Sequence, residues 1–382
     1  RSSPCSVAPF GLSRRQEYSG HVFWDAETFM FPATLLTDPE AAKAMLEYRC
    51  RQAPRARMNA KLTGYAGLQF PWQTGNHGWE VTPFYSEGIK EEHINLDVAF
   101  AMGQYVEATG DELFFRQHAW PVIQGVAEWI ASRVKETERG FEIHHLVGID
   151  ESLSNVNNDA ETNALAAIVL RRATACARRL GFAPPARWTE IADRMFIPID
   201  PGSRVILKND THDLGLDKAC SDVMMLTFPF DYPLVPEVRE ATVRYNIERA
   251  HTYLGMPMNS ANFAVWACRA GERERAVEFL EAGMMSRLEQ PFWQLVESNR
   301  FPYNGSRTET VFVTACGAYL TAILQGLTGL QFEGADPQDW ARHRVALPQG
   351  WEAVEVEQVR ARGSVMRLTA RHGSARAELV EQ

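Results

Sequence analysis

Three carboxylates in aromatic or loop surroundings are the residues of this 382-residue chain best suited to chemistry. Asp25 lies in HVFWDAE, Glu151 in GIDES and Glu297 in FWQLVESNRF. Hydrolysis of a glycosidic bond needs an acid that protonates the leaving oxygen and a base or anion on the opposite face, so a carboxylate pair in an aromatic cleft suits a sugar. The tryptophans that could offer stacking faces to sugar C–H groups are Trp24, Trp72, Trp79 and Trp293.

Other chemistries find less support in the sequence. Each carboxylate, taken alone, could also be a surface or capping side chain. A calcium loop at Asp150 and Glu151 fails the EF-hand spacing at its Gly and terminal Glu positions. We find no GxGxxG after a strand, no GxxxxGK[ST], no HExxH and no GxSxG, and the six cysteines form no CxxC pair. We therefore expect no metal and no cofactor.

Composition limits the partners and the location. The chain carries 48 acidic and 39 basic residues, for a net charge of −9, and lacks a basic block with interleaved aromatics, which excludes a nucleic-acid partner. No apolar run approaches the ~20 residues of a membrane span. Singly scattered thiols favour a cytoplasmic protein. The first residue is Arg, so a processed or truncated N-terminus stays open, as does a homodimer.

Apolar residues recur at helical spacing through most of the chain. The pattern flips after residue 340, where HRVALP, WEAVEVEQVRA, SVMRLTAR and SARAELVE alternate apolar and polar residues, as in an antiparallel sheet open to water on one face. We expect a helical domain over 1–335 and a small β domain over 340–382. Helices are expected at 41–51, 94–109, 112–135, 160–180, 217–226, 236–250, 260–270, 272–287 and 310–327.

The loops between these helices alternate in character. Those at 72–92, 141–158 and 291–309 are long and hold many of the Trp, His and carboxylate residues. Loops gathered at one end of a rigid scaffold are a usual place for a binding site. With no fixed solenoid repeat in the sequence, we expect a closed ring of helix pairs.

Five segments resemble, in the same order, motifs of glycoside hydrolase family 65: GHVFWDAETFMFP, GLQFPWQTG, EEHINLDVAFA, VGIDES…NVNNDAETN and VFVTACGAYLTAILQGLTGL. The resemblance covers residues 18 to 330, and the β tail resembles the family's C-terminal sheet. It implies an all-α fold, an (α/α)6 barrel with a small C-terminal antiparallel β-sheet. The family includes disaccharide phosphorylases and inverting α-glucoside hydrolases. Its large N-terminal β-sandwich has no counterpart in this sequence.

The resemblance also implies roles for particular residues. Glu151 falls where the family has its general acid, and proton delivery near neutrality requires its pKa to be raised. Trp24 and Asp25 match the aromatic–acid pair that holds the non-reducing sugar. Glu91 and His93 match a Glu-x-His that lines the cleft, although an acidic residue also suits a helix N-terminus.

The second catalytic group decides the reaction. Family phosphorylases bind phosphate with a His and a Ser, and those places hold Phe312 and Ala315 here. The resemblance then makes Glu297 the base that activates water. Inversion predicts that the Glu151 and Glu297 carboxyl groups lie about 6.5 to 9.5 Å apart. A phosphorylase of the same fold and a catalytically idle carbohydrate-binding module stay as alternatives.

Several positions that differ from the family pattern bear on which sugar the site binds. The usual Trp-Glu is Trp72-Gln73 here, and the usual Lys-Gln is Ala219-Cys220, with Lys218 next to it. A site built for hydrogen bonds to sugar hydroxyls loses affinity when one partner is removed. Either Lys218 compensates or the sugar is not plain glucose. We count Trp72, Gln73 and Lys218 among the predicted substrate-binding residues.

Overall fold

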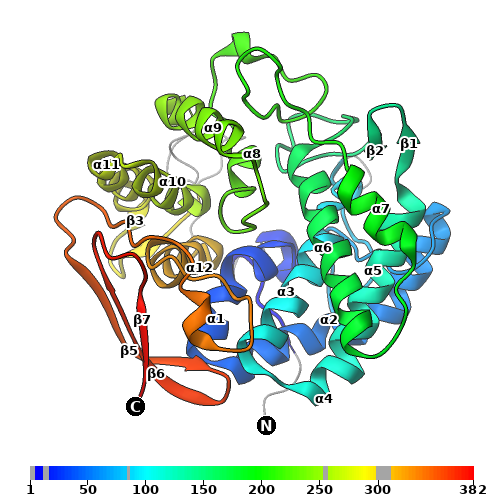
Figure 1. Ribbon diagram of the computed structural model, residues 1–382, viewed down its shortest axis with the longest axis horizontal. Helices are drawn as coiled ribbons and strands as arrows, with labels where there is room; N and C mark the ends of the chain where they lie inside the picture. Colours follow the sequence, from blue (N-terminus) through cyan, green and yellow to red (C-terminus); the bar gives the residue numbers. More distant parts are fainter. Residues whose placement is uncertain (1–4, 12–16, 84–86, 253–256, 298–310) are drawn as a thin grey trace. The chain divides into compact units, whose positions relative to one another are not determined.

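The computed structural model describes residues 5–11, 17–83, 87–252, 257–297 and 311–382, and helices account for most of the ordered elements (Figure 1). Two compact units divide the chain, and each is described by itself. The first unit comprises Arg1–Met45, Glu107–Gly110 and Val243–Gln382, and the second comprises Leu46–Val106 and Asp111–Thr242.

The α-helices vary in length from one turn to seven. Three π-helical segments extend or precede them, η2 (Ala26–Met30), η4 (Phe115–Ala119) and η8 (Ala322–Leu327). The α-helices are α1 (Phe31–Thr37), α2 (Pro39–Thr63), α3 (His93–Thr109), α4 (Glu112–Phe114), α5 (Trp120–Arg133), α6 (Ala160–Arg179), α7 (Ala186–Arg194), α8 (Ser221–Met225), α9 (Pro236–Glu248), α10 (Pro257–Ala270), α11 (Arg273–Gly283) and α12 (Val313–Thr321).

Helix α6 is the central helix of the second unit and packs against α5, α7 and α8. Asp159 caps its N-terminus, because the carboxylate accepts the backbone N–H of Thr162 at 2.9 Å and its hydroxyl at 2.8 Å. The helix ends before Gly181, whose φ of 80° suits a residue without Cβ. Most of its first three turns is buried, so the loops joined to this N-terminus rest on a fixed base.

Helix α12 packs closely against η2 in the first unit. A Cβ on Gly317 would lie 2.7 Å from the Met30 Cα and 2.9 Å from the Phe29 carbonyl oxygen, so only glycine allows this approach. The hydroxyl of Thr321 donates to the same Phe29 carbonyl at 2.9 Å. These contacts hold the segment that follows Trp24 against the middle and the end of α12.

The C-terminal sheet has the order β5 (Ala353–Ala361), β6 (Ser364–Arg371), β7 (Glu378–Glu381), all antiparallel (Figure 1). Arg362 and Gly363 form its first turn with φ of 51° and 85°, the positive values that a two-residue hairpin requires. Met366, Leu368 and Ala370 bury one face, as the alternation predicts. The sheet lies in the same compact unit as α1, against which β5 packs. The domain boundary at 335–340 stays a prediction.

Sequence and structure differ in local detail. Helices α1 and α7 were not expected, and the short hairpin of β1 (Lys135–Thr137) and β2 (Gly140–Glu142) precedes residue 340. The segment HRVALP forms no strand, although Val345 exchanges two backbone hydrogen bonds with the turn at 373–374. The helix expected at 217–226 begins only at Ser221, because Asp217 adopts a left-handed conformation after a 3₁₀ turn.

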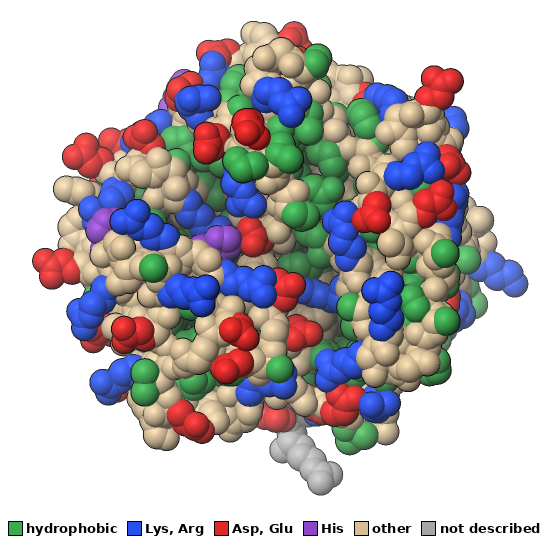
Figure 2. Space-filling model, in the orientation of Figure 1, with side chains coloured by type: hydrophobic (Ala, Val, Ile, Leu, Met, Phe, Trp, Pro, Cys, Tyr) green, Lys and Arg blue, Asp and Glu red, His purple; other side chains and the backbone are tan. Residues whose placement is uncertain are grey.

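Surface charge follows the mixed composition. Acidic and basic side chains are interspersed over the face drawn in Figure 2, unlike the single-sign basic surface typical of nucleic-acid binders. Within the described ranges, no helix combines the length and the apolar character that crossing a bilayer requires.

We predict that Gly317→Ala lowers the free energy of unfolding by about 1 to 3 kcal/mol, since the added methyl group meets backbone atoms that cannot rotate away. Chemical denaturation measures the change. Gly202→Ala is the matched control, because the nearest atom to its Cβ would be an Asp200 carboxylate oxygen at 3.4 Å, an ordinary contact distance. Equal stability of the two variants would contradict the close packing of α12 on η2.

Candidate active site

Glu151 lies on a turn that the second unit holds at several points. Leu146 and Val156 exchange backbone hydrogen bonds of 3.0 and 2.9 Å, which close the loop between them. At the start of the turn, a Cβ on Gly148 would lie 2.3 Å from the Asp159 carboxylate, so the chain here touches the N-terminus of α6. Glu151 itself is exposed. The loop thus presents this carboxyl group to solvent from a fixed base.

Asp150 stabilises the turn by accepting hydrogen bonds from a neighbouring residue of the same turn. Its carboxylate accepts hydrogen bonds from the backbone N–H of Ser152 at 3.0 Å and from the Ser152 hydroxyl at 2.5 Å. The Lys208 ammonium lies 2.5 Å from the other carboxylate oxygen. These donors lower the pKa of Asp150 against the opposing effect of burial. Asp150 is therefore ionised at neutral pH.

The neighbouring Glu151 has the opposite tendency. Although its side chain reaches solvent, the protein around it desolvates the carboxyl group and raises its pKa, and the charge of Asp150 raises it further. The positive charge of His93 opposes both effects. The pKa values of two adjacent carboxyl groups are thus shifted in opposite directions, which is the arrangement that a general acid needs.

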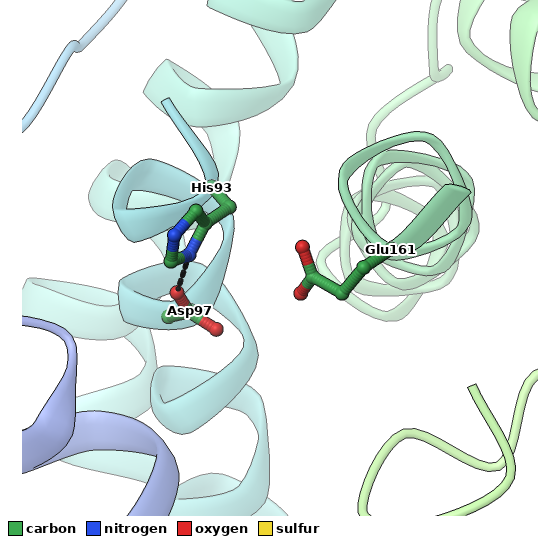
Figure 3. A group of neighbouring side chains, drawn as sticks. All are labelled: His93, Asp97 and Glu161. Carbon is green, nitrogen blue, oxygen red and sulfur yellow. Dashed lines mark hydrogen bonds and ion pairs between the residues drawn. The ribbon is translucent and has the colours of Figure 1, made fainter. Parts of the chain in front are cut away.

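His93 stands at the first position of α3 among three acidic side chains. Its Nδ1 lies 2.9 Å from Asp97, one turn along the helix, and its Nε2 lies 3.6 Å from Glu91. Figure 3 shows Glu161 of α6 facing the same ring from the other side. His93 is fully buried and Glu91 nearly so. Sugar contact by these two residues stays a prediction, and their burial favours a role beneath the site.

His93, Asp97 and Glu161 form a buried group of one basic and two acidic side chains. One ring nitrogen and one oxygen from each carboxylate lie within 4.8 Å of one another. Among the described residues, these atoms are near enough to hold a metal ion. Burial alone would lower the pKa of His93, but hydrogen bonds to Asp97 and Glu91 and the charges of Asp97 and Glu161 raise it well above its usual value. A protonated imidazole has no free lone pair for a metal.

Buried acids continue from this cluster along α6 and α8. Burial raises the pKa of Glu161 well above its usual value, and the charges of Asp97, Asp159 and Asp222 add to the effect although His93 opposes it. Burial likewise raises the pKa of Asp222 to about 7, against the opposing charge of Lys208. Both acids therefore keep their protons more readily than exposed carboxyl groups do.

Trp72 and Gln73 lie in a loop that Glu80 holds together. The Glu80 carboxylate accepts the backbone N–H of Trp72 at 2.7 Å and that of Gln73 at 3.2 Å. The Trp72 ring meets the edge of His93, with centroids 5.2 Å apart. Each of the two side chains is 7% exposed, so little of either reaches the surface of this unit. Their contact with sugar stays a prediction.

Trp24 and Asp25 lie at the start of η2 in the first unit, and both are nearly buried. The Thr314 hydroxyl donates to Asp25 at 2.7 Å, which ties the acid to α12. Trp24 packs edge-on against Phe29 at 5.0 Å. The sequence motif did not indicate Thr314 as the partner of Asp25. The structure brings the two together across 289 residues of chain.

Glu297 follows a short hairpin of β3 (Leu288–Glu289) and β4 (Gln294–Leu295). The Arg287 guanidinium donates to the backbone carbonyl of Glu297, and the Glu297 side chain is half-buried. The backbone N–H of Phe312 donates to Leu295 at 2.7 Å. Residues 298–310 lie outside the described residues. The predicted separation of the Glu151 and Glu297 carboxyl groups stays a prediction.

Phe312 and Ala315 are buried in an apolar cluster with Phe10 and Leu295. Phe10 and Phe312 have their ring centroids 5.1 Å apart. Neither Phe312 nor Ala315 has a polar side-chain atom, so these two positions offer no side-chain hydrogen bond to a phosphate.

The lysine that meets the acid turn lies outside the sequence motifs. Lys218 is exposed, and its role in sugar binding stays a prediction. Lys208, which sequence reasoning missed, ion-pairs with Asp150 and is half-buried near Cys220 and Asp222. No local sequence pattern indicates this role of Lys208, because the two partners of the ion pair are 58 residues apart in the sequence.

Solved structures share this fold. A protein from the human microbiome, provisionally named a kojibiose phosphorylase, superposes with a TM-score of 0.76 at 17% identity, covering 100% of this chain and 59% of its own. A glycosidase solved with glucose has a TM-score of 0.58 at 10% identity, covering 83% of this chain and 90% of its own. The fold class is as predicted: mostly helical, an (α/α)6 barrel with a C-terminal antiparallel sheet.

Proteins of similar sequence identify the family to which the chain belongs. A kojibiose hydrolase of Flavobacterium johnsoniae is 33% identical over 93% of this chain and 51% of its own length. A protein-glucosylgalactosylhydroxylysine glucosidase of Gallus gallus is 36% identical over 89% of this chain and 49% of its own. Residues 2–219 match the glycosyl hydrolase family 65 central catalytic domain, so the chain belongs to that family. It spans about half the length of these curated relatives.

We predict that Asp97→Asn lowers the pKa of His93, because it removes a charged hydrogen-bond partner. Since the folded pKa is raised, His93 contributes stability that is full below its unfolded pKa of about 6.5 and is lost as pH rises through the folded value. Ring-nitrogen NMR measures the titration, and urea unfolding against pH measures the linkage.

The matched control for this change is Asp193→Asn, an exposed acid of the same unit, which should leave the His93 titration unchanged. If His93 in the wild-type protein titrated at its ordinary value, the buried charge cluster would be misassigned.

Proposed function

We propose that this protein hydrolyses an α-linked glucoside with inversion, with Glu151 as general acid and Glu297 as general base. The observation that carries the proposal is the split between two adjacent carboxyl groups, since Asp150 has a lowered pKa and Glu151 a raised one. A carboxyl group that keeps its proton near neutral pH can donate it to the leaving oxygen.

The reaction follows from the separate roles. Glu151 protonates the glycosidic oxygen as the bond to the anomeric carbon breaks, and Glu297 removes a proton from the water that attacks the opposite face. Trp24 and Asp25 hold the sugar, with Asp25 oriented by the Thr314 hydroxyl. Trp72, Gln73 and Lys218 remain our candidates for further sugar contacts.

The names of the relatives support a glucosyl substrate, since one is a kojibiose hydrolase and another a glucosidase. Hydrolysis is favoured over phosphorolysis because Phe312 and Ala315 are packed in an apolar cluster, where the resemblance places phosphate-binding side chains. A carbohydrate-binding module without turnover is the remaining alternative, and the raised pKa of Glu151 argues against it.

Carbohydrate is the partner that this proposal requires. The sequence predicts that nucleic acid is not a partner and that the location is cytoplasmic, and it leaves a homodimer open. These points remain predictions.

We predict that Glu151→Gln lowers turnover of an α-glucoside with a sugar leaving group by about 10²- to 10⁴-fold, because no proton reaches the leaving oxygen. The same variant should retain activity on α-glucosyl fluoride, whose leaving group needs little protonation. Glu297→Gln should lose activity on both substrates, since water is no longer activated. Steady-state kinetics without phosphate measures all four rates.

Glu138→Gln and Glu278→Gln are the matched controls, as each removes the charge of an exposed glutamate. Full activity of Glu151→Gln on the disaccharide would remove Glu151 from the mechanism. A strict requirement of the wild-type protein for phosphate would replace hydrolysis by phosphorolysis, and no turnover on any α-glucoside would favour the binding module.

A further inference from the structure

Lys208 lies outside every motif that pointed to the site, yet it makes the ion pair closest to the proposed acid. Its Nζ is 2.5 Å from the Asp150 Oδ2, and its side chain is 13% exposed against 37% for Asp150. A pair that is partly withdrawn from water is screened less than a surface pair and holds a more definite geometry. Asp150 directly precedes Glu151 in the turn.

The backbone of Lys208 is fixed on both sides. Its N–H donates to the His212 Nδ1 at 2.9 Å, and its carbonyl accepts the N–H of Ala160, the first residue of α6, at 2.8 Å. The ammonium group is therefore projected from the same base on which the acid turn rests. Lys208 links the N-terminus of α6 directly to Asp150.

Acidic side chains surround this lysine. Asp150 and Asp222 lie near enough to raise the pKa of Lys208, and the charge of Lys208 in turn acts to lower the pKa of Asp159. Glu151 responds to two of the neighbouring charges, Asp150 on its own turn and His93 on α3. Without Lys208, Asp150 would keep a partly buried negative charge with no cation in contact beside Glu151.

We propose that Lys208 is the positioning residue of the general acid: its ion pair with Asp150 holds the turn that carries Glu151 and offsets the charge next to its carboxyl group. Lys208 acts through Asp150 and does not itself transfer a proton. The inference rests on the proposed role of Glu151. It gives this half-buried lysine a function that packing alone would not require.

The test compares Lys208→Met with Lys208→Arg and with Lys61→Met, an exposed lysine of the same unit. Loss of the lysine charge leaves Asp150 to oppose ionisation of Glu151. The alkaline limb of the pH profile of kcat/KM on an α-glucoside should therefore move up by about half a pH unit or more in Lys208→Met. Lys208→Arg should keep the wild-type limb, and Lys61→Met should change nothing.

The double variant Asp150→Asn/Lys208→Met identifies the path of the effect. With both charges removed, the upward movement should disappear, and it should reverse in Asp150→Asn alone. An unchanged limb in Lys208→Met, or an equal upward movement in the Asp150→Asn background, overturns the proposal.

A second measurement does not depend on turnover. ¹³C NMR of carboxyl-labelled glutamate, assigned with Glu151→Gln, gives the Glu151 titration directly in each variant that keeps its circular dichroism spectrum. An upward shift in Lys208→Met supports the positioning role even if no α-glucoside is hydrolysed, in which case only the proposed function fails. No shift contradicts the positioning role whatever the activity.

Discussion

Two cations, His93 and Lys208, lie among carboxyl groups that are largely withdrawn from water at the start of α6. Burying a carboxylate costs free energy unless a cation or hydrogen-bond donors compensate. Asp97 and Asp150 find such partners at 2.9 and 2.5 Å. Glu161 finds less compensation, and its pKa rises instead. Contact with a cation thus distinguishes Asp97 and Asp150 from Glu161, and Glu151 stands at the exposed edge of this group.

The unit that carries Asp25 and Glu297 is built differently. Asp25 accepts a hydrogen bond from the Thr314 hydroxyl, and the segment around it is fixed by the glycine-dependent approach of α12 to η2. Phe312 lies in an apolar cluster. Apolar packing therefore positions this part of the first unit, whereas ion pairs position the turn that carries Glu151. A proton donor needs a controlled electrostatic environment, whereas a sugar-binding acid needs above all a fixed position.

Periodicity was enough to predict the helices and the alternating strands of the C-terminal sheet, because both depend on local burial patterns. Motif order was enough to identify the family and to single out Glu151. Asp97 could have been found as well, since it stands one turn after His93 on a helix that the sequence predicts. Helices α1 and α7 were missed because α1 continues a π-helical segment and α7 is short.

Lys208 and Thr314 could not be found from the sequence in the same way. Their partners lie 58 and 289 residues away, and nothing in the neighbouring residues marks either side chain as functional. Lys218, predicted from its motif position to bind the sugar, is exposed and that role stays a prediction, whereas Lys208 meets the acid turn. Long-range ion pairs and hydrogen bonds depend on the folded chain, and these are the contacts that set the state of the site.

The stereochemistry of the first product tests the central claim most directly. ¹H NMR of an α-glucoside during the first minutes of hydrolysis distinguishes the two anomers before mutarotation mixes them. An acid and a base acting on opposite faces with water as nucleophile predict β-glucose as the initial product. Initial release of α-glucose would contradict the account, because it requires a covalent intermediate and a nucleophilic carboxylate in place of the base.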